Sequence, residues 1–91
     1  MRTYSRTSQF KKDVKLAAKR GKDLSKLKHL MELLIGEKIL SSIYRDHALQ
    51  GEFSGSRDCH IEPDWILVYS LEDGGKHVRF ERTGTHSDLF R

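Results

Sequence analysis

The residues that could do chemistry are three histidines, an aspartate and an arginine, each in a predicted loop or at the end of a predicted strand. Histidine titrates near neutral pH, so one imidazole can take up a proton while another releases one. Arginine is always charged, and its planar side chain matches a phosphate group. Cleavage of RNA without a metal requires a base for the 2′-hydroxyl, an acid for the leaving 5′-oxygen and a cation for the crowded phosphorane. The candidate catalytic residues are therefore His47, His60, Asp64, Arg82 and His86.

Five histidines also raise the possibility of a metal site, but their spacing argues against one. The sequence has no H-x-x-x-H pair and no C-x-x-C pair, which are the usual spacings of zinc ligands. We therefore expect neither a metal nor a cofactor. His29 and His77 are predicted to be solvated surface groups. Taken singly, each of the other three histidines is more often structural than catalytic, so the prediction depends on the whole set.

A β-hairpin at residues 57–71 is the best-specified element and carries two of the candidates. Pro63 and Asp64 suit the two central positions of a tight turn. Side chains alternate across a strand, so Asp58, His60 and Glu62 share one face. Residues 65–69, at the start of the second strand, are almost all apolar, as is typical of a central strand covered on both faces.

The next predicted strand, residues 77–83, raises a question about Arg82. Val78 and Phe80 face inward and Arg82 has the same parity, so a regular strand would direct the guanidinium into the core. Either the strand ends or bulges before Arg82, or Arg82 faces a cavity.

Two amphipathic helices precede the hairpin. The first begins after Thr7 or Ser8 and ends at Gly21, and the second runs from about Asp23 to Gly36. With a short edge strand near the N-terminus, these elements predict an α+β fold. It has two N-terminal antiparallel helices packed on a twisted, mainly antiparallel sheet of about four strands. The pattern assigns no element to residues 37–56.

The positive charge is concentrated at the N-terminus. The chain carries a net charge of +4, but residues 1–28 hold ten lysines or arginines against two aspartates, and residues 29–91 hold seven against eleven acids. Such a basic segment can bind a polyanion, most commonly nucleic acid, although a solvated helix face is the simpler alternative. The first helix presents a basic ridge of lysines three or four residues apart: Lys11, Lys15, Lys19 and Lys22.

Length and composition indicate one domain, residues 1–91, in the cytoplasm. Ninety-one residues suffice for one modest core. No apolar run approaches the roughly 20 residues of a membrane span, and the N-terminal segment lacks the apolar centre of a signal peptide. The single cysteine, Cys59, is expected to be a small strand residue.

Three motifs connect the candidate residues to a known family. They are DH-x-L-x-G at residues 46–51, H-I-x-P-D-W at 60–65 and ERTGTH at 81–86. With the helical segment KDVKLAAKRGKDLSKLKHLMELL, they closely resemble the YafQ group of bacterial toxins in the RelE/ParE superfamily, over nearly the whole chain. The resemblance implies a small ribonuclease-like fold and cleavage of messenger RNA in the A site of the ribosome. It also implies neutralisation by a DinJ-like antitoxin and a toxin that is monomeric by itself.

The resemblance implies an active site formed by His47, His60, Asp64, Trp65, Arg82, His86 and Phe90. His86 is then expected to be the general acid, and His47 or His60, oriented by Asp64, the general base. Arg82 is expected to stabilise the phosphorane. Trp65 and Phe90 are expected to shape the RNA site or stack on a base, although Trp65 is at least as well explained as a core residue. The basic ridge is expected to contact ribosomal RNA.

Two alternative functions stay open. ParE-like relatives share the scaffold but bind DNA gyrase without catalysis, and a fold alone does not fix a function. A metal-dependent nuclease is the other alternative. Three loop histidines with an arginine favour metal-independent RNA cleavage, because a gyrase binder needs no paired acid and base.

Overall fold

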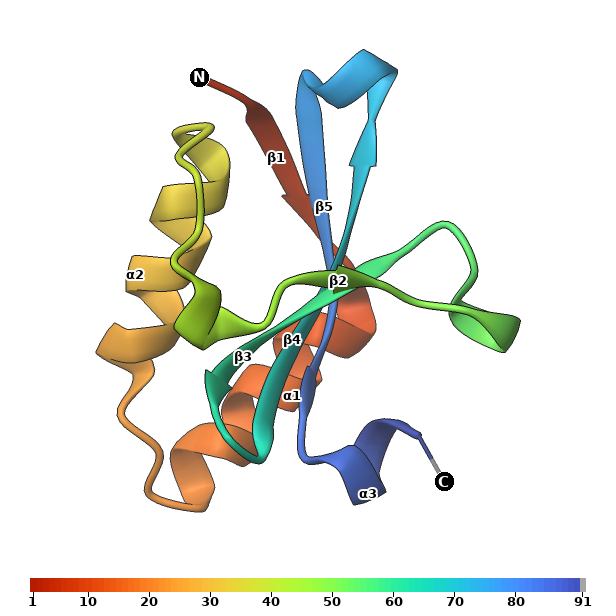
Figure 1. Cartoon of the computed structure of the whole chain (residues 1–91). Helices are drawn as coiled ribbons and strands as arrows, with labels where there is room; N and C mark the ends of the chain where they lie inside the picture. The colour runs from red at the N-terminus through yellow and green to blue at the C-terminus, as the bar shows by residue number, and fades with distance from the viewer. Residues whose placement is uncertain (91) are drawn as a thin grey trace.

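The computed structural model describes residues 1–90, which fold into two layers, a five-stranded sheet and two helices (Figure 1). The helices and strands follow in the order β1 Thr3–Arg6, α1 Ser8–Lys19, α2 Leu24–Ile35, β2 His47–Ala48, β3 Arg57–Glu62, β4 Trp65–Glu72, β5 His77–Gly84 and α3 His86–Leu89. Three short 3₁₀ turns lie between them, at Ser42–Tyr44, Gly51–Phe53 and Asp73–Gly75. None of the described helices is long and apolar enough to cross a membrane.

The sheet is mixed, with the strand order β1-β5-β4-β3-β2. β1 runs parallel to β5, and the other neighbours are antiparallel. The α+β class is confirmed, but the sheet has five strands, one more than expected. The additional strand, β2, lies within the segment 37–56, to which the sequence pattern assigned nothing. A third helix, α3, follows β5.

Local sequence explains where the two long helices begin and end. The Thr7 hydroxyl accepts a hydrogen bond from the backbone N–H of Phe10, which satisfies a free donor at the start of α1. Asp23 caps α2 in the same way, and Gly36 ends it. These boundaries confirm the two predicted helices. The predicted tight turn is confirmed too, because only Pro63 and Asp64 lie between the end of β3 at Glu62 and the start of β4 at Trp65.

The main core lies between the two long helices and one face of the sheet. It contains Phe10, Ala17, Leu27, Leu30, Leu34, Cys59, Trp65, Leu67, Tyr69, Val78 and Phe80. A smaller cluster of Ile66, Val68 and Leu89 lies on the opposite face and packs against Phe53 and Phe90. Because alternate residues of β4 enter the two clusters, this strand is covered on both faces, as its apolar sequence predicted.

A β-bulge in β5 resolves the position of Arg82. Tyr69 pairs with Phe80, but the preceding residue, Val68, pairs with Arg82, so Glu81 is an extra residue in β5. Such a bulge reverses the alternation that follows it. Arg82 therefore pairs with Val68, and its side chain does not enter the main core.

Candidate active site

Three imidazoles form a row on the sheet face opposite α1 and α2. His47 comes from β2, His60 from β3 and His86 from the first residue of α3. The ring centroids of His47 and His60 are 6.3 Å apart, and those of His60 and His86 are 5.5 Å apart. The side chains of His47 and His86 are 54% and 55% exposed, whereas that of His60 is 9% exposed. The row thus has two accessible ends and a buried centre.

Each imidazole is held at the same nitrogen, Nδ1, by an oxygen that can only accept a hydrogen bond. The acceptors are Arg45 O at 2.7 Å from His47, Pro63 O at 3.2 Å from His60 and Asp64 Oδ1 at 2.9 Å from His86. The proton of each neutral ring is therefore assigned to Nδ1. In the neutral form of each ring Nε2 therefore carries the lone pair, and it is the nitrogen that can take part in proton transfer.

Asp64 positions His86 at the start of α3. Its Oδ1 atom accepts hydrogen bonds from the backbone N–H of His86 at 3.0 Å and from the ring Nδ1 at 2.9 Å. These bonds hold the pKa of Asp64 below its usual value. The expectation that Asp64 orients His47 or His60 is therefore wrong for this structure. The hairpin turn that carries Asp64 ends beside α3 and not beside β2.

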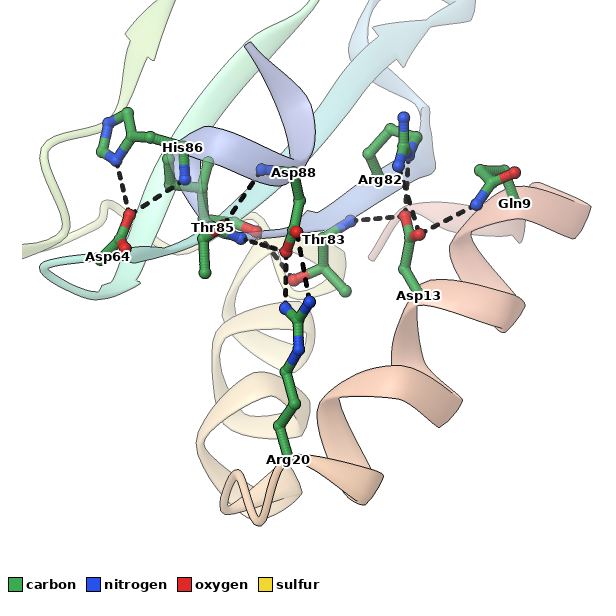
Figure 2. A network of polar contacts seen from close by, with 10 residues as sticks. Gln9, Asp13, Arg20, Asp64, Arg82, Thr83, Thr85, His86 and Asp88 are labelled. Carbon is green, nitrogen blue, oxygen red and sulfur yellow. Dashed lines mark hydrogen bonds and ion pairs between the residues drawn. The ribbon is translucent and has the colours of Figure 1, made fainter. Parts of the chain in front are cut away.

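The short helix α3 is fixed by a network that reaches back to α1 (Figure 2). Thr85 and Asp88 form a capping box, and Arg20 binds the Asp88 carboxylate through NH1 at 2.7 Å and NH2 at 3.3 Å. The Arg20 contact is the main reason that the pKa of Asp88 lies well below its usual range. A single helical turn has little stability of its own, so these contacts determine where His86 lies.

Arg82 is paired with Asp13 of α1 (Figure 2). Its Nε and NH2 atoms lie 2.8 and 3.3 Å from the two carboxylate oxygens, and Asp13 also accepts from the Thr83 N–H at 3.1 Å and from Gln9 at 3.0 Å. Arg82 uses two of its five N–H donors in this pair, and its side chain is 29% exposed. The structure therefore places Arg82 in a paired state, and its role at a phosphate stays a prediction.

Trp65 is a core residue, which corrects its predicted role in RNA binding. It is 1% exposed and belongs to the main core beneath the helices, on the other face of the sheet from the imidazoles. An indole in that position cannot stack on a base. Phe90, by contrast, lies beside the row, with its ring centroid 6.0 Å from that of His86 and 5.4 Å from that of Phe53.

The basic ridge is shorter than predicted. Lys11, Lys15 and Lys19 are exposed along α1, but Lys22 lies beyond the end of that helix. The Lys22 amine is 2.9 Å from the Glu62 carboxylate and 5.7 Å from the centre of the Trp65 ring. Lys22 is thus a cation that ties the hairpin turn to the helices, and its predicted place on the first helix is wrong, while its contact with RNA stays a prediction.

Asp58 is the residue near the row that sequence reasoning missed as a candidate. It lies on β3, is 3% exposed, and its Oδ1 atom is 3.1 Å from His47 Nδ1 and 3.9 Å from His60 Nε2. Burial raises the pKa of Asp58, while the neighbouring histidines oppose that effect. Strand alternation had placed Asp58 on the face of His60, which was the available signal. Residues 1–90 contain no cluster of three or more histidine, cysteine or acidic side chains arranged to hold a metal.

Comparisons with known proteins agree on one family. The model of a family described as the bacterial toxin of type II toxin-antitoxin system, YafQ, matches residues 2–91. The mRNA interferase toxin YafQ of Escherichia coli strain K12 is 59% identical over 85 residues, which cover 92% of this chain and 90% of that protein. The crystal structure of YafQ from E. coli strain BL21(DE3) has a TM-score of 0.93 and 54% identity, and YafQ in the E. coli DinJ-YafQ complex has 0.91 and 55%, each over 100% of both chains.

Proposed function

The chain belongs to the YafQ family of bacterial toxins of type II toxin-antitoxin systems, and we propose that it stops translation by cutting messenger RNA in the A site of the ribosome. The activity is that of an endoribonuclease, as in the relative named mRNA interferase. The observation that supports it best is the row of three imidazoles, each held at Nδ1 with Nε2 left for proton transfer.

The proposed reaction is a metal-independent transfer of the phosphoryl group to the 2′-oxygen. A neutral imidazole takes the proton from the 2′-hydroxyl, the O2′–P bond forms, the P–O5′ bond breaks, and a protonated imidazole gives its proton to the leaving 5′-oxygen. The products are a 2′,3′-cyclic phosphate and a 5′-hydroxyl end. The exposed ends of the row favour His47 as the base and His86 as the acid, because His60 is largely buried.

Other residues have supporting roles in this proposal. The free N–H donors of Arg82 would contact a phosphate oxygen of the phosphorane. Phe90 would position the RNA beside His86, since its ring is the aromatic neighbour of that imidazole. Lys11, Lys15 and Lys19 would contact ribosomal RNA, whose attraction for lysine does not depend on sequence.

The proposed partner that controls the toxin is an antitoxin similar to DinJ. The solved complex of E. coli DinJ and YafQ supports this choice, because its toxin matches the whole chain. We propose that the toxin by itself is a monomer and acts in the cytoplasm, where the ribosomes are.

Reconstituted translation with purified ribosomes and one defined message tests the function. Primer extension should show new 5′ ends inside the open reading frame, and a message without a start site should stay intact. His86→Ala should lower the rate of cutting by about 10²- to 10⁴-fold, whereas His29→Ala, which removes an exposed histidine of α2, should leave it unchanged. Intact messages together with cleaved gyrase–DNA complexes would instead identify a gyrase poison.

A further inference from the structure

Asp58 carries a buried carboxylate directly beside the histidine row. The side chain is 4% exposed, and Oδ1 lies 3.1 Å from His47 Nδ1 without an aligned hydrogen bond to any partner. A buried carboxylate is costly unless a cation or several donors compensate it. Its environment must therefore supply a positive charge, or the group must be protonated.

Another buried aspartate shows what a structural carboxylate looks like in this fold. Asp13 is 7% exposed, and its two oxygens accept four hydrogen bonds, from Gln9, from the Thr83 N–H and twice from Arg82. Asp58 has a similar burial but no such set of donors at Oδ1. Its closest possible cations are imidazoles, which are charged only after they gain a proton.

Among the charged groups that act on Asp58, only the histidines can compensate its negative charge. The charges that act on it are those of His47 on β2, His60 on β3, His86 on α3 and Asp46 just before β2. Its neighbour on β4 is the apolar Val68. Three of the charged groups nearby already have partners, as shown by the pairs Arg57–Asp46, Arg82–Asp13 and Glu81–Ser56.

We propose that Asp58 is a positioning residue whose carboxylate holds one extra proton on the pair of His47 and His60. This inference rests on the proposed nuclease function and deepens it. His60 is the imidazole that carries the charge, because its Nδ1–H is bound by Pro63 O and its Nε2 lies 3.9 Å from Asp58. His47 then stays neutral and acts as the base. The charged His60 supplies a fixed cation near the phosphorane, while Arg82 is held by Asp13.

The test compares the full-length protein with Asp58→Asn, which removes the charge and keeps the shape. We expect the cleavage rate on ribosome-bound message at pH 7 to fall, and the pH–rate profile to move toward lower pH by about one unit or more, since an opposite charge at this distance favours the protonated ring. Asp73→Asn makes the same change in the exposed turn before β5 and should leave the rate and the profile unchanged. An unchanged profile for Asp58→Asn overturns the proposal, because a merely structural aspartate would alter stability and not the profile.

Nitrogen NMR of the imidazoles in the free protein gives a second readout that requires neither ribosomes nor RNA. At pH 7 the wild-type spectrum should show His60 protonated at both nitrogens and His47 protonated at Nδ1 alone. In Asp58→Asn both rings should show the neutral form. If the wild-type spectrum already shows two neutral rings, the proposal fails even where the variant does not fold. If the wild type shows the charged ring but cuts no message, the proposed function fails and the pairing with Asp58 stands.

Discussion

The contact between Asp64 and His86 gives the sharpest prediction about the proposed acid. Asp64 holds both the backbone N–H and the ring Nδ1 of His86, so the two residues should act as a unit. His86→Ala removes the acid and should lower the cleavage rate by about 10²- to 10⁴-fold, the usual contribution of one proton-transfer group. Asp64→Ala leaves the imidazole in place but free to turn. It should lower the rate by about tenfold, because water screens a contact between two half-exposed side chains.

A double-mutant cycle on single-turnover cleavage of ribosome-bound message tests this unit. In the His86→Ala background, Asp64→Ala should have no further effect, since there is no ring left to orient. The result that refutes the reasoning is an Asp64→Ala effect of the same factor in both backgrounds. Both variants should fold, and His86→Ala should change the free energy of unfolding by less than about 0.5 kcal/mol, as is usual for exposed positions. His29→Ala is the matched control.

Three other perturbations separate structural roles from catalytic ones. Asp13→Ala leaves Arg82 and the Thr83 N–H without their partner and should lower the free energy of unfolding by about 3 kcal/mol in urea titrations; a change below a few tenths would show that the pair is not needed. Burial raises the pKa of Asp58 above that of the unfolded chain, so its contribution to stability is present at low pH and lost as pH rises through the raised pKa. Asp58→Asn should therefore be more stable than wild type at pH 7 but not at pH 3, in urea titrations at both values, and a variant that is less stable at pH 7 contradicts this sign. The third perturbation replaces the ridge lysines Lys11, Lys15 and Lys19 by alanine. It should lower the salt dependence of ribosome binding, with the slope of log K against log salt reduced by about two in sedimentation assays. An unchanged slope would exclude the ridge from the interface.

A metal requirement needs a test other than chelation, since EDTA also removes the magnesium on which ribosomes depend. A message with a phosphorothioate at the cut site should be cleaved at the same reduced rate with and without Cd²⁺ if imidazoles alone move the protons. Rescue of the rate by Cd²⁺ would show that a metal contacts the reacting phosphate.

The long elements of the fold could be predicted from local sequence. The hairpin turn at Pro63 and the helix caps at Thr7 and Asp23 each depend on residues next to one another in the chain. The elements that were missed depend on distant partners. β2 has two residues and exists because it pairs with β3, and α3 is one turn held by Arg20 from the end of α1. No periodicity in so few residues could reveal either.

The three imidazoles of the site were predictable, but the acids that pair with them were not. The three histidines were found because they lie outside any apolar pattern, and the structure brings them into one row. Which acid orients which histidine depends on where the hairpin turn ends, and the pairing expected for Asp64 from the family resemblance was wrong. Trp65 is the reverse case, a residue that was predicted to belong to the site and does not. The family resemblance placed it in the site, while its burial shows that it supports the strand from the helix side.

The bulge at Glu81 links the fold to the site. Without that extra residue, β5 would direct Arg82 toward the main core, and the alternation would place the Thr83 side chain on the outer face. The bulge instead pairs Arg82 with Val68, and the Arg82 guanidinium is held by Asp13 of α1. Asp13 occupies two of the N–H donors of Arg82, so only the remaining donors are available to a phosphate. Under the proposed role of Asp58, a proton held on an imidazole adds a second positive charge beside the row.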